Sequence, residues 1–104
     1  MFKLQPKPTF TAVAKISIPG QEAPADVEIE FKHLGVKALK AFFTDIGERT
    51  DAESLALIVV GWKGVDADFS QEALATFLDN YPQSAGELFV AFRQAALESR
   101  TKNS

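Results

Sequence analysis

The spacing of the apolar residues changes near the end of the first third of the chain, and this change constrains the fold more than any other feature. Over residues 9–18 and 25–33 apolar and polar residues alternate, which is the pattern of β-strands with one face against a core. Pro19, Gly20 and Pro24 mark a short loop between the two runs, so we predict an antiparallel hairpin. The residues expected to face inward are Phe10, Ala12, Ala14, Ile16, Ile18, Val27, Ile29, Phe31 and His33.

After the hairpin the apolar spacing becomes that of helices. The apolar face of the first predicted helix consists of Val36, Leu39, Phe42, Phe43 and Ile46. Gly47 follows this face, and glycine is favoured just past a helix end. Thr50 and Glu53 have the spacing of a capping box, which predicts a second, shorter helix that ends near Gly61. Its inward residues are expected to be Leu55, Ile58 and Val59.

Two further helices are predicted in the last third of the chain. Ser70 is a favoured N-cap residue and begins the third helix. That helix carries Leu74, Phe77 and Leu78. It should end before Pro82, because a proline keeps the residue before it, Tyr81, out of the helical conformation. The fourth helix is expected over residues 83–98, with an apolar stripe of Ala85, Leu88, Phe89, Phe92, Ala95 and Ala96.

The order of these elements, strands first and helices after them, favours an α+β fold. We predict an N-terminal antiparallel β-hairpin packed on a bundle of about four α-helices. The chain has 104 residues, the length of one domain, so residues 1–104 are expected to form a single domain. Within it we expect the hairpin at 9–33, the helical part at 35–99, and flexible ends at 1–8 and 100–104.

The composition excludes several classes of function. The chain has no cysteine and one histidine, so it cannot form a disulfide, a thiolate zinc site or a site with several histidine ligands. Its 11 basic and 14 acidic side chains include no polybasic tract, which argues against nucleic acid as a partner. No apolar stretch approaches the roughly 20 residues that span a bilayer, and residues 1–20 contain no signal-peptide core. We therefore expect no nucleic acid and no membrane among the partners.

Three sets of polar residues are candidates for chemistry, and each is more simply structural. His33 stands at a strand end without a nearby nucleophile motif. Asp66 and Asp68 lack the further oxygen ligands that calcium requires. One strand face carries an acidic row, which is typical of solvating charge that protects a sheet from aggregation. This row consists of Asp26, Glu28 and Glu30. We predict no catalytic, metal-binding or cofactor-binding residue and no enzymatic activity.

The segment between Gly61 and Tyr81 is the most informative about binding. Trp62, the single tryptophan, lies in it beside a glycine, followed by further apolar residues. Two interpretations remain open: Trp62 anchors the core between the second and third helices, or it helps form an apolar surface that a partner covers. The same question applies to the phenylalanines of the last helix. The candidate partner-binding residues are Trp62, Val65, Phe69, Phe89 and Phe92.

Short motifs in a fixed order run along nearly the whole chain. They are Phe2-Lys3-Leu4, Pro8-Thr9-Phe10, Phe31-Lys32-His33, Ile58-Val59-Val60-Gly61-Trp62, Gly64-Val65-Asp66, Phe69-Ser70 and Asn80-Tyr81-Pro82. An alanine-rich helix and a basic-polar tail follow them. With this ordered set the chain resembles the tail assembly chaperones of long-tailed bacteriophages and prophages.

The resemblance implies a role in binding without catalysis. Proteins of this family bind the long, hydrophobic tape measure protein, keep it soluble and help recruit tail tube subunits around it. The resemblance therefore implies the tape measure protein and the major tail tube protein as partners, the host bacterial cytoplasm as the location, and absence from the mature virion. A mildly acidic domain rich in phenylalanine suits that role, because its charge keeps it soluble while apolar surface covers the client.

Many genes of this family also make a longer product by a programmed −1 ribosomal frameshift. Thr101, Lys102 and Asn103 can be encoded by a slippery string, which raises the hypothesis of such a longer form here. Two other classes of function stay open, a small structural or connector protein of the phage tail and, more remotely, a small ligand-binding domain or enzyme. The phenylalanine surplus and an open hairpin edge also predict self-association.

Overall fold

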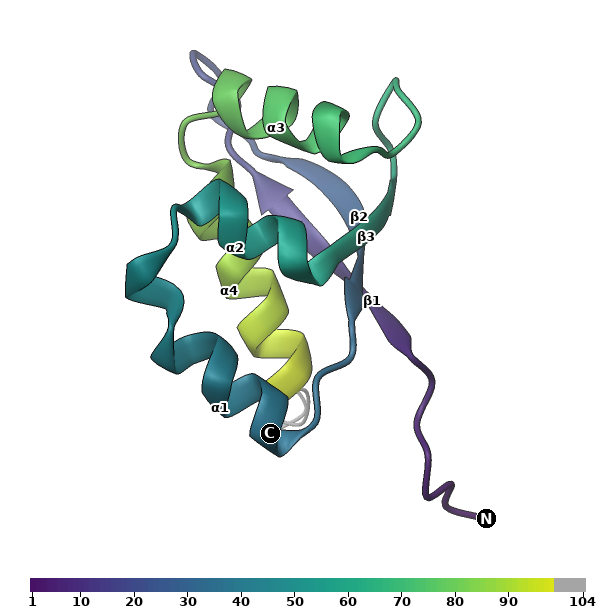
Figure 1. Cartoon of the computed structure of the whole chain (residues 1–104). Coiled ribbons are helices and arrows are strands. Elements are labelled where there is room, and N and C mark those ends of the chain that lie inside the picture. Colours follow the sequence, from purple (N-terminus) through teal and green to yellow (C-terminus); the bar gives the residue numbers. More distant parts are fainter. Residues whose placement is uncertain (99–104) are drawn as a thin grey trace.

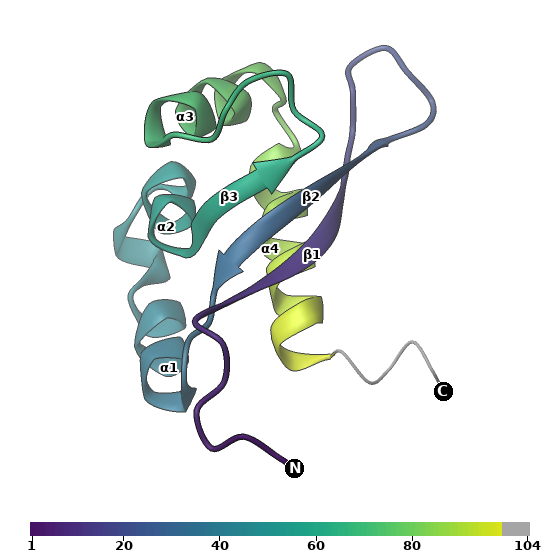
Figure 2. The same cartoon turned by 90° about the vertical axis from the view of Figure 1, so that its right-hand side faces the viewer.

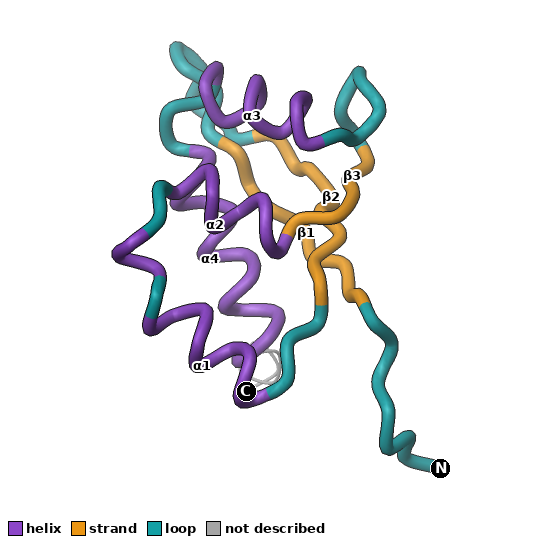
Figure 3. The backbone as a smooth tube through the Cα atoms, in the orientation of Figure 1, coloured by secondary structure: helices purple, strands orange, loops and turns teal. Residues whose placement is uncertain are grey.

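The computed structural model describes residues 1–98, and within them the chain forms three strands, four α-helices and one short 3₁₀ helix (Figures 1 and 3). The strands are β1 (Thr9–Ile16), β2 (Ala25–Lys32) and β3 (Val59–Lys63). The helices are α1 (Val36–Thr44), the 3₁₀ helix η1 (Ile46–Glu48), α2 (Asp51–Ile58), α3 (Gln71–Asn80) and α4 (Ser84–Leu97). The predicted α+β class, with a hairpin packed on helices, is confirmed. The predicted tail at 100–104 lies outside the described residues.

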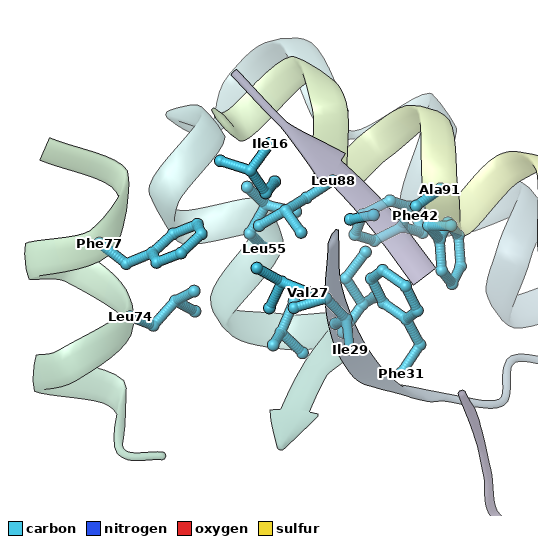
Figure 4. Packing of buried hydrophobic residues seen from close by; sticks show 14 residues of the cluster. Ile16, Val27, Ile29, Phe31, Phe42, Leu55, Leu74, Phe77, Leu88 and Ala91 are labelled. Atoms are coloured by element: carbon cyan, nitrogen blue, oxygen red, sulfur yellow. The ribbon is translucent and has the colours of Figure 1, made fainter. Parts of the chain in front are cut away.

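The sheet has the order β1-β2-β3, and both pairs of strands are antiparallel. One face of the sheet packs on the helices (Figure 2), and this face is apolar. The other face carries charged side chains. On that charged face the Lys15 ammonium lies 2.8 Å from a carboxylate oxygen of Asp26 on the neighbouring strand. The core between sheet and helices contains Ala14, Ile16, Val27, Ile29, Phe31, Phe42, Leu55, Ile58, Val59, Leu74, Phe77, Leu88, Ala91 and Phe92 (Figure 4).

Five phenylalanines form a cluster at one end of this core. Phe92 of α4 lies at its centre, with its ring centroid 5.3 Å from that of Phe31 and 6.0 Å from those of Phe10 and Phe42. The centroid of Phe43 lies 6.4 Å from that of Phe92. Such stacked, tilted and edge-to-face pairs of rings add to the stabilisation that comes from burying apolar area. The cluster therefore joins β1, β2, α1 and α4.

The prediction that the second helix continues to Gly61 is wrong. Helix α2 ends at Ile58, and the chain continues at once as β3 beside β2. Val59 and Val60 are β-branched and prefer extended backbone, and the edge of β2 offers unpaired backbone groups to them. Gly61 lies opposite Glu30, where a Cβ atom would approach the Glu30 carboxylate to 2.8 Å. The glycine thus lets the acidic side chain of β2 lie across β3.

Three residues expected on apolar faces lie in solvent instead: Val36, His33 and, in the last turn of α4, Ala96. Val36 is the first residue of α1 and is 83% exposed. The helix contacts the core further along, where Phe42 is buried. His33 follows the end of β2 and is also exposed, so the alternation of that strand stops at Lys32. The other residues predicted to face inward from the two hairpin strands are buried or half-buried.

The predicted N-caps of α2 and α3 are confirmed, whereas the predicted helix end at Gly47 is wrong: α1 ends at Thr44 with Asp45 as its C-cap, and Gly47 lies within η1. The Thr50 hydroxyl accepts from the Glu53 backbone N–H, and the Glu53 carboxylate accepts from the Thr50 backbone N–H at 2.8 Å. The Ser70 hydroxyl accepts from the Ala73 backbone N–H at 2.9 Å. Tyr81 follows α3 in an extended conformation, as the proline after it requires.

The capping box gives a pH-dependent contribution to stability. The backbone N–H of Thr50, then its hydroxyl and the nearby Arg49, hold the pKa of Glu53 below its ordinary value. A lowered folded-state pKa means that this contribution is complete above the unfolded-state pKa and is lost as the pH falls through the folded-state pKa. We expect Glu53→Ala to lower the urea midpoint at pH 7 and to differ less from the parent at acidic pH. An equal difference at both pH values would contradict the charged capping bond.

Candidate partner-binding surface

An open groove lies between the far end of the hairpin and helix α3. One wall is formed by the end of β1 and the start of β2, the other by α3, and the loop from β3 to α3 closes it. Its volume is about 590 Å³, within the usual range of small-molecule sites. The apolar side chains that line it are Ile16, Ile18, Ala25, Val27, Trp62, Val65, Ala67, Ala73, Phe77 and Tyr81. We call this feature the hairpin–α3 groove.

Trp62 is held in a fixed orientation beside this groove. Its indole N–H donates to the backbone carbonyl oxygen of Ala67 at 2.8 Å, which ties strand β3 to the following loop. Its ring lies edge-to-face with Phe69, with centroids 5.2 Å apart, and its centroid is 5.5 Å from that of Phe77. Gly64, with a φ of +92°, makes the turn that brings the loop back to the indole. The half-buried indole therefore belongs both to the edge of the core and to the wall of the groove.

The structure separates the five residues predicted for partner binding. Trp62 and Val65 line the hairpin–α3 groove, and Phe69 packs behind the indole as a half-buried ring. Phe89 is half-buried on α4 and does not line this groove. Phe92 is 0% exposed in the phenylalanine cluster, so it presents no surface to a partner in this fold.

Two further residues that line the groove were not predicted to bind a partner. Tyr81 lines it, and its ring centroid lies 5.4 Å from that of Phe77. Ile18 lines it from the chain segment just after β1. Neither could be assigned from the sequence, because the groove forms only when the hairpin end and α3 come together.

The α3 side of the groove is acidic. Residues 64–92, which include the loop after β3 and all of α3, contain five carboxylates and no Lys, Arg or His. One of these carboxylates, Asp66, lines the groove directly. The apolar walls with acidic neighbours favour a ligand that is both apolar and basic.

The polar sets weighed for chemistry do not come together. Asp26 lies at the start of β2, where it pairs with Lys15, whereas His33 lies past the end of the same strand. Among residues 1–98 no three His, Cys, Asp or Glu side chains are grouped so that they could hold a metal ion. Within the same residues no helix is both long and apolar enough to cross a bilayer.

Comparison with known proteins identifies the family. The family model for phage tail assembly chaperones matches residues 1–103, which is essentially the whole chain. No curated protein and no solved structure gives a significant match. A family match of this length includes the strands, the groove and all four helices described above. The chain therefore belongs to the phage tail assembly chaperone family.

Proposed function

We propose that this protein binds the tape measure protein in the hairpin–α3 groove and keeps it soluble during tail assembly. The observation that supports this most strongly is a groove of about 590 Å³ with apolar walls, open to solvent, in a member of a chaperone family. A long helical client exposes apolar stripes, and a groove that takes one or two turns of such a helix covers part of a stripe. Many copies along the client together supply the binding energy.

The charge around the groove defines the client segment further. The carboxylates of the loop and of α3, including Asp66, favour segments in which Lys or Arg flank the apolar residues. The negative net charge of −3 also keeps complexes of many chaperones in solution. The client proposed here is therefore an amphipathic helix with basic residues beside its apolar stripe.

Co-expression with the tape measure protein of the same phage tests this proposal. We expect the parent chain to raise the soluble fraction of the client several-fold and Thr76→Arg to abolish the gain. Thr76 is exposed on α3 and lines the groove, so arginine there fills the groove and adds a positive charge. Arginine is also a better helix former than threonine, so α3 should remain folded.

Ala75→Arg is the matched control. Ala75 is its exposed neighbour on α3 and does not line the groove, so this variant should keep the client soluble. Equal activity of both variants would place the client elsewhere on the chain. No rise in client solubility with the parent chain would remove the proposed function itself.

The family acts in the host cell during assembly, and we propose that this protein works in the host cytoplasm and is left out of the finished particle. Mass spectrometry of purified virions tests this directly. Abundant copies in the particle would instead support the structural or connector role. The major tail tube protein is proposed as a second partner, which a pull-down with the chaperone–client complex would detect.

A longer, frameshifted form is a separate proposal about the gene. The residues concerned, Thr101, Lys102 and Asn103, lie outside residues 1–98. The codons for these residues decide the matter: a slippery string supports a second product, and its absence there removes the support.

A further inference from the structure

The segment before β1 is an exposed apolar arm. Residues 1–8 extend away from the body of the molecule (Figure 1). Phe2 is 97% exposed and Leu4 is 90% exposed, and with Met1 they are the most exposed large apolar side chains among residues 1–98. Water-exposed side chains of this size on a soluble protein indicate a surface that another element covers.

The arm and the hairpin–α3 groove carry opposite charge. Residues 1–8 contain Lys3 and Lys7 and no carboxylate, although the chain as a whole is acidic. The groove combines apolar walls with Asp66, and its α3 side belongs to residues 64–92, a stretch with five carboxylates and no basic residue. The nearest lysines on the hairpin side and on β3, Lys15 and Lys63, lie within 4.0 Å of the carboxylates of Asp26 and Glu28. The arm is thus a ligand of the kind that the groove favours, apolar and basic.

The two elements lie at opposite ends of the sheet. The arm leads into Thr9 at the start of β1, whereas Ile16 at the end of the same strand lines the groove. Pro6 and Pro8 restrict the backbone of the arm and of the residues before them, which opposes a reversal along its own strand. An arm that points away from its own groove is placed to reach the groove of another molecule.

We propose that the arm of one copy docks in the hairpin–α3 groove of a second copy. In an extended segment Phe2 and Leu4 project on one side and Lys3 on the other. The two apolar side chains then enter the groove while the lysine faces the acidic rim. This contact joins different surfaces of the two copies, so it repeats head-to-tail and produces chains or closed rings.

Self-association through the arm occupies the groove assigned above to the client. A client helix and the arm then compete for the groove, and client binding dissociates the oligomer. Only this competition rests on the proposed function. The contact between two copies itself requires no client and is tested without one. Loss of client binding with intact self-association would therefore remove the function and leave the contact between copies.

Mixing two variants of the full chain tests the head-to-tail contact. We expect light scattering of the parent to show a mass that rises with concentration above the monomer mass of 11.3 kDa. Phe2→Ser with Leu4→Ser should give a monomer, as should Thr76→Arg, whereas Ala75→Arg should behave as the parent. A mixture of the arm variant and Thr76→Arg should form a dimer, because the arm variant supplies an intact groove and Thr76→Arg supplies an intact arm. A monomeric parent at all concentrations, or oligomers that survive both variants, would overturn the proposal.

Trp62, the only tryptophan, reports on occupancy of the groove. A peptide of residues 1–8, added to the Phe2→Ser, Leu4→Ser variant, should change the Trp62 emission until the groove is saturated. The peptide should bind more weakly at high salt, which screens the attraction between its lysines and the carboxylates. The same peptide with both apolar residues replaced by serine should have no effect. The opposite result would be a parent that is monomeric at every concentration and whose Trp62 emission differs from that of the Phe2→Ser, Leu4→Ser variant. In that case the arm lies in the groove of its own molecule, and docking on a second copy is excluded.

Discussion

Phe92→Ala should be the most destabilising single substitution considered for this chain, with a loss of about 3–5 kcal/mol in the free energy of unfolding. The Phe92 ring is fully buried, and four other phenylalanine rings have centroids within 6.4 Å of it. Removing it leaves a cavity where β1, β2, α1 and α4 meet. Because a domain of this size is stable by only about 5–15 kcal/mol, the variant should lose much of its folded population on mild heating.

Urea unfolding followed by circular dichroism measures this effect. Val90→Ala on the same helix is the control, because Val90 is 43% exposed and its truncation should change stability by less than about 0.5 kcal/mol. Phe89→Ala should fall between the two, since Phe89 is half-buried against the core. If Phe92→Ala lowered the free energy of unfolding by less than about 1 kcal/mol, the central position of this ring would be contradicted.

The local signals in the sequence determine much of this fold. Alternation places Ile29 and Phe31 in the core, and the N-caps Thr50 and Ser70 begin their helices where the side-chain oxygens can accept backbone N–H groups. These signals act between residues that are close in the chain. They are therefore readable without knowledge of the tertiary structure.

Strand β3 shows what such signals miss. Its five residues follow α2 without a loop, and the run from Leu55 to Val59 is compatible with a helix or a strand. The choice is made by pairing with β2, about 30 residues earlier, which local spacing does not reveal. The same long-range pairing positions Trp62, so the groove wall depends on it.

The sequence indicates only some of the residues that line the groove, because the groove depends on contacts between segments far apart in the chain. Trp62 and Val65 belong to a segment whose glycines and apolar residues indicate a structured loop, and both line the groove. Phe89 and Phe92 lie on one apolar stripe of a helix, but a stripe alone does not show which residues face the sheet. Phe92 faces the sheet and the phenylalanine cluster, which leaves it no contact with solvent.

Trp62→Ala should separate the two roles of this residue. Its indole contacts Phe69 and Phe77 and donates to the Ala67 carbonyl. Truncation should cost about 2–3 kcal/mol, less than the roughly 3–5 kcal/mol typical of large aromatic residues, because the indole is only half-buried. Trp62→Phe keeps a ring in place and loses mainly the hydrogen bond, for about 1 kcal/mol. If the groove binds the client, Trp62→Ala should lose client solubilisation even at temperatures where it is fully folded.

Phe69→Ala provides the control that distinguishes binding from stability. Phe69 packs on the far side of the indole and does not line the groove, so its loss should lower stability to a similar extent but spare the client. Co-expression at a low temperature, together with urea unfolding of each variant, measures both quantities. If Trp62→Ala and Phe69→Ala lose client in proportion to their unfolded fractions, Trp62 is only a core anchor. In that case the client binds elsewhere, because a client bound through the indole would be lost in Trp62→Ala and retained in Phe69→Ala.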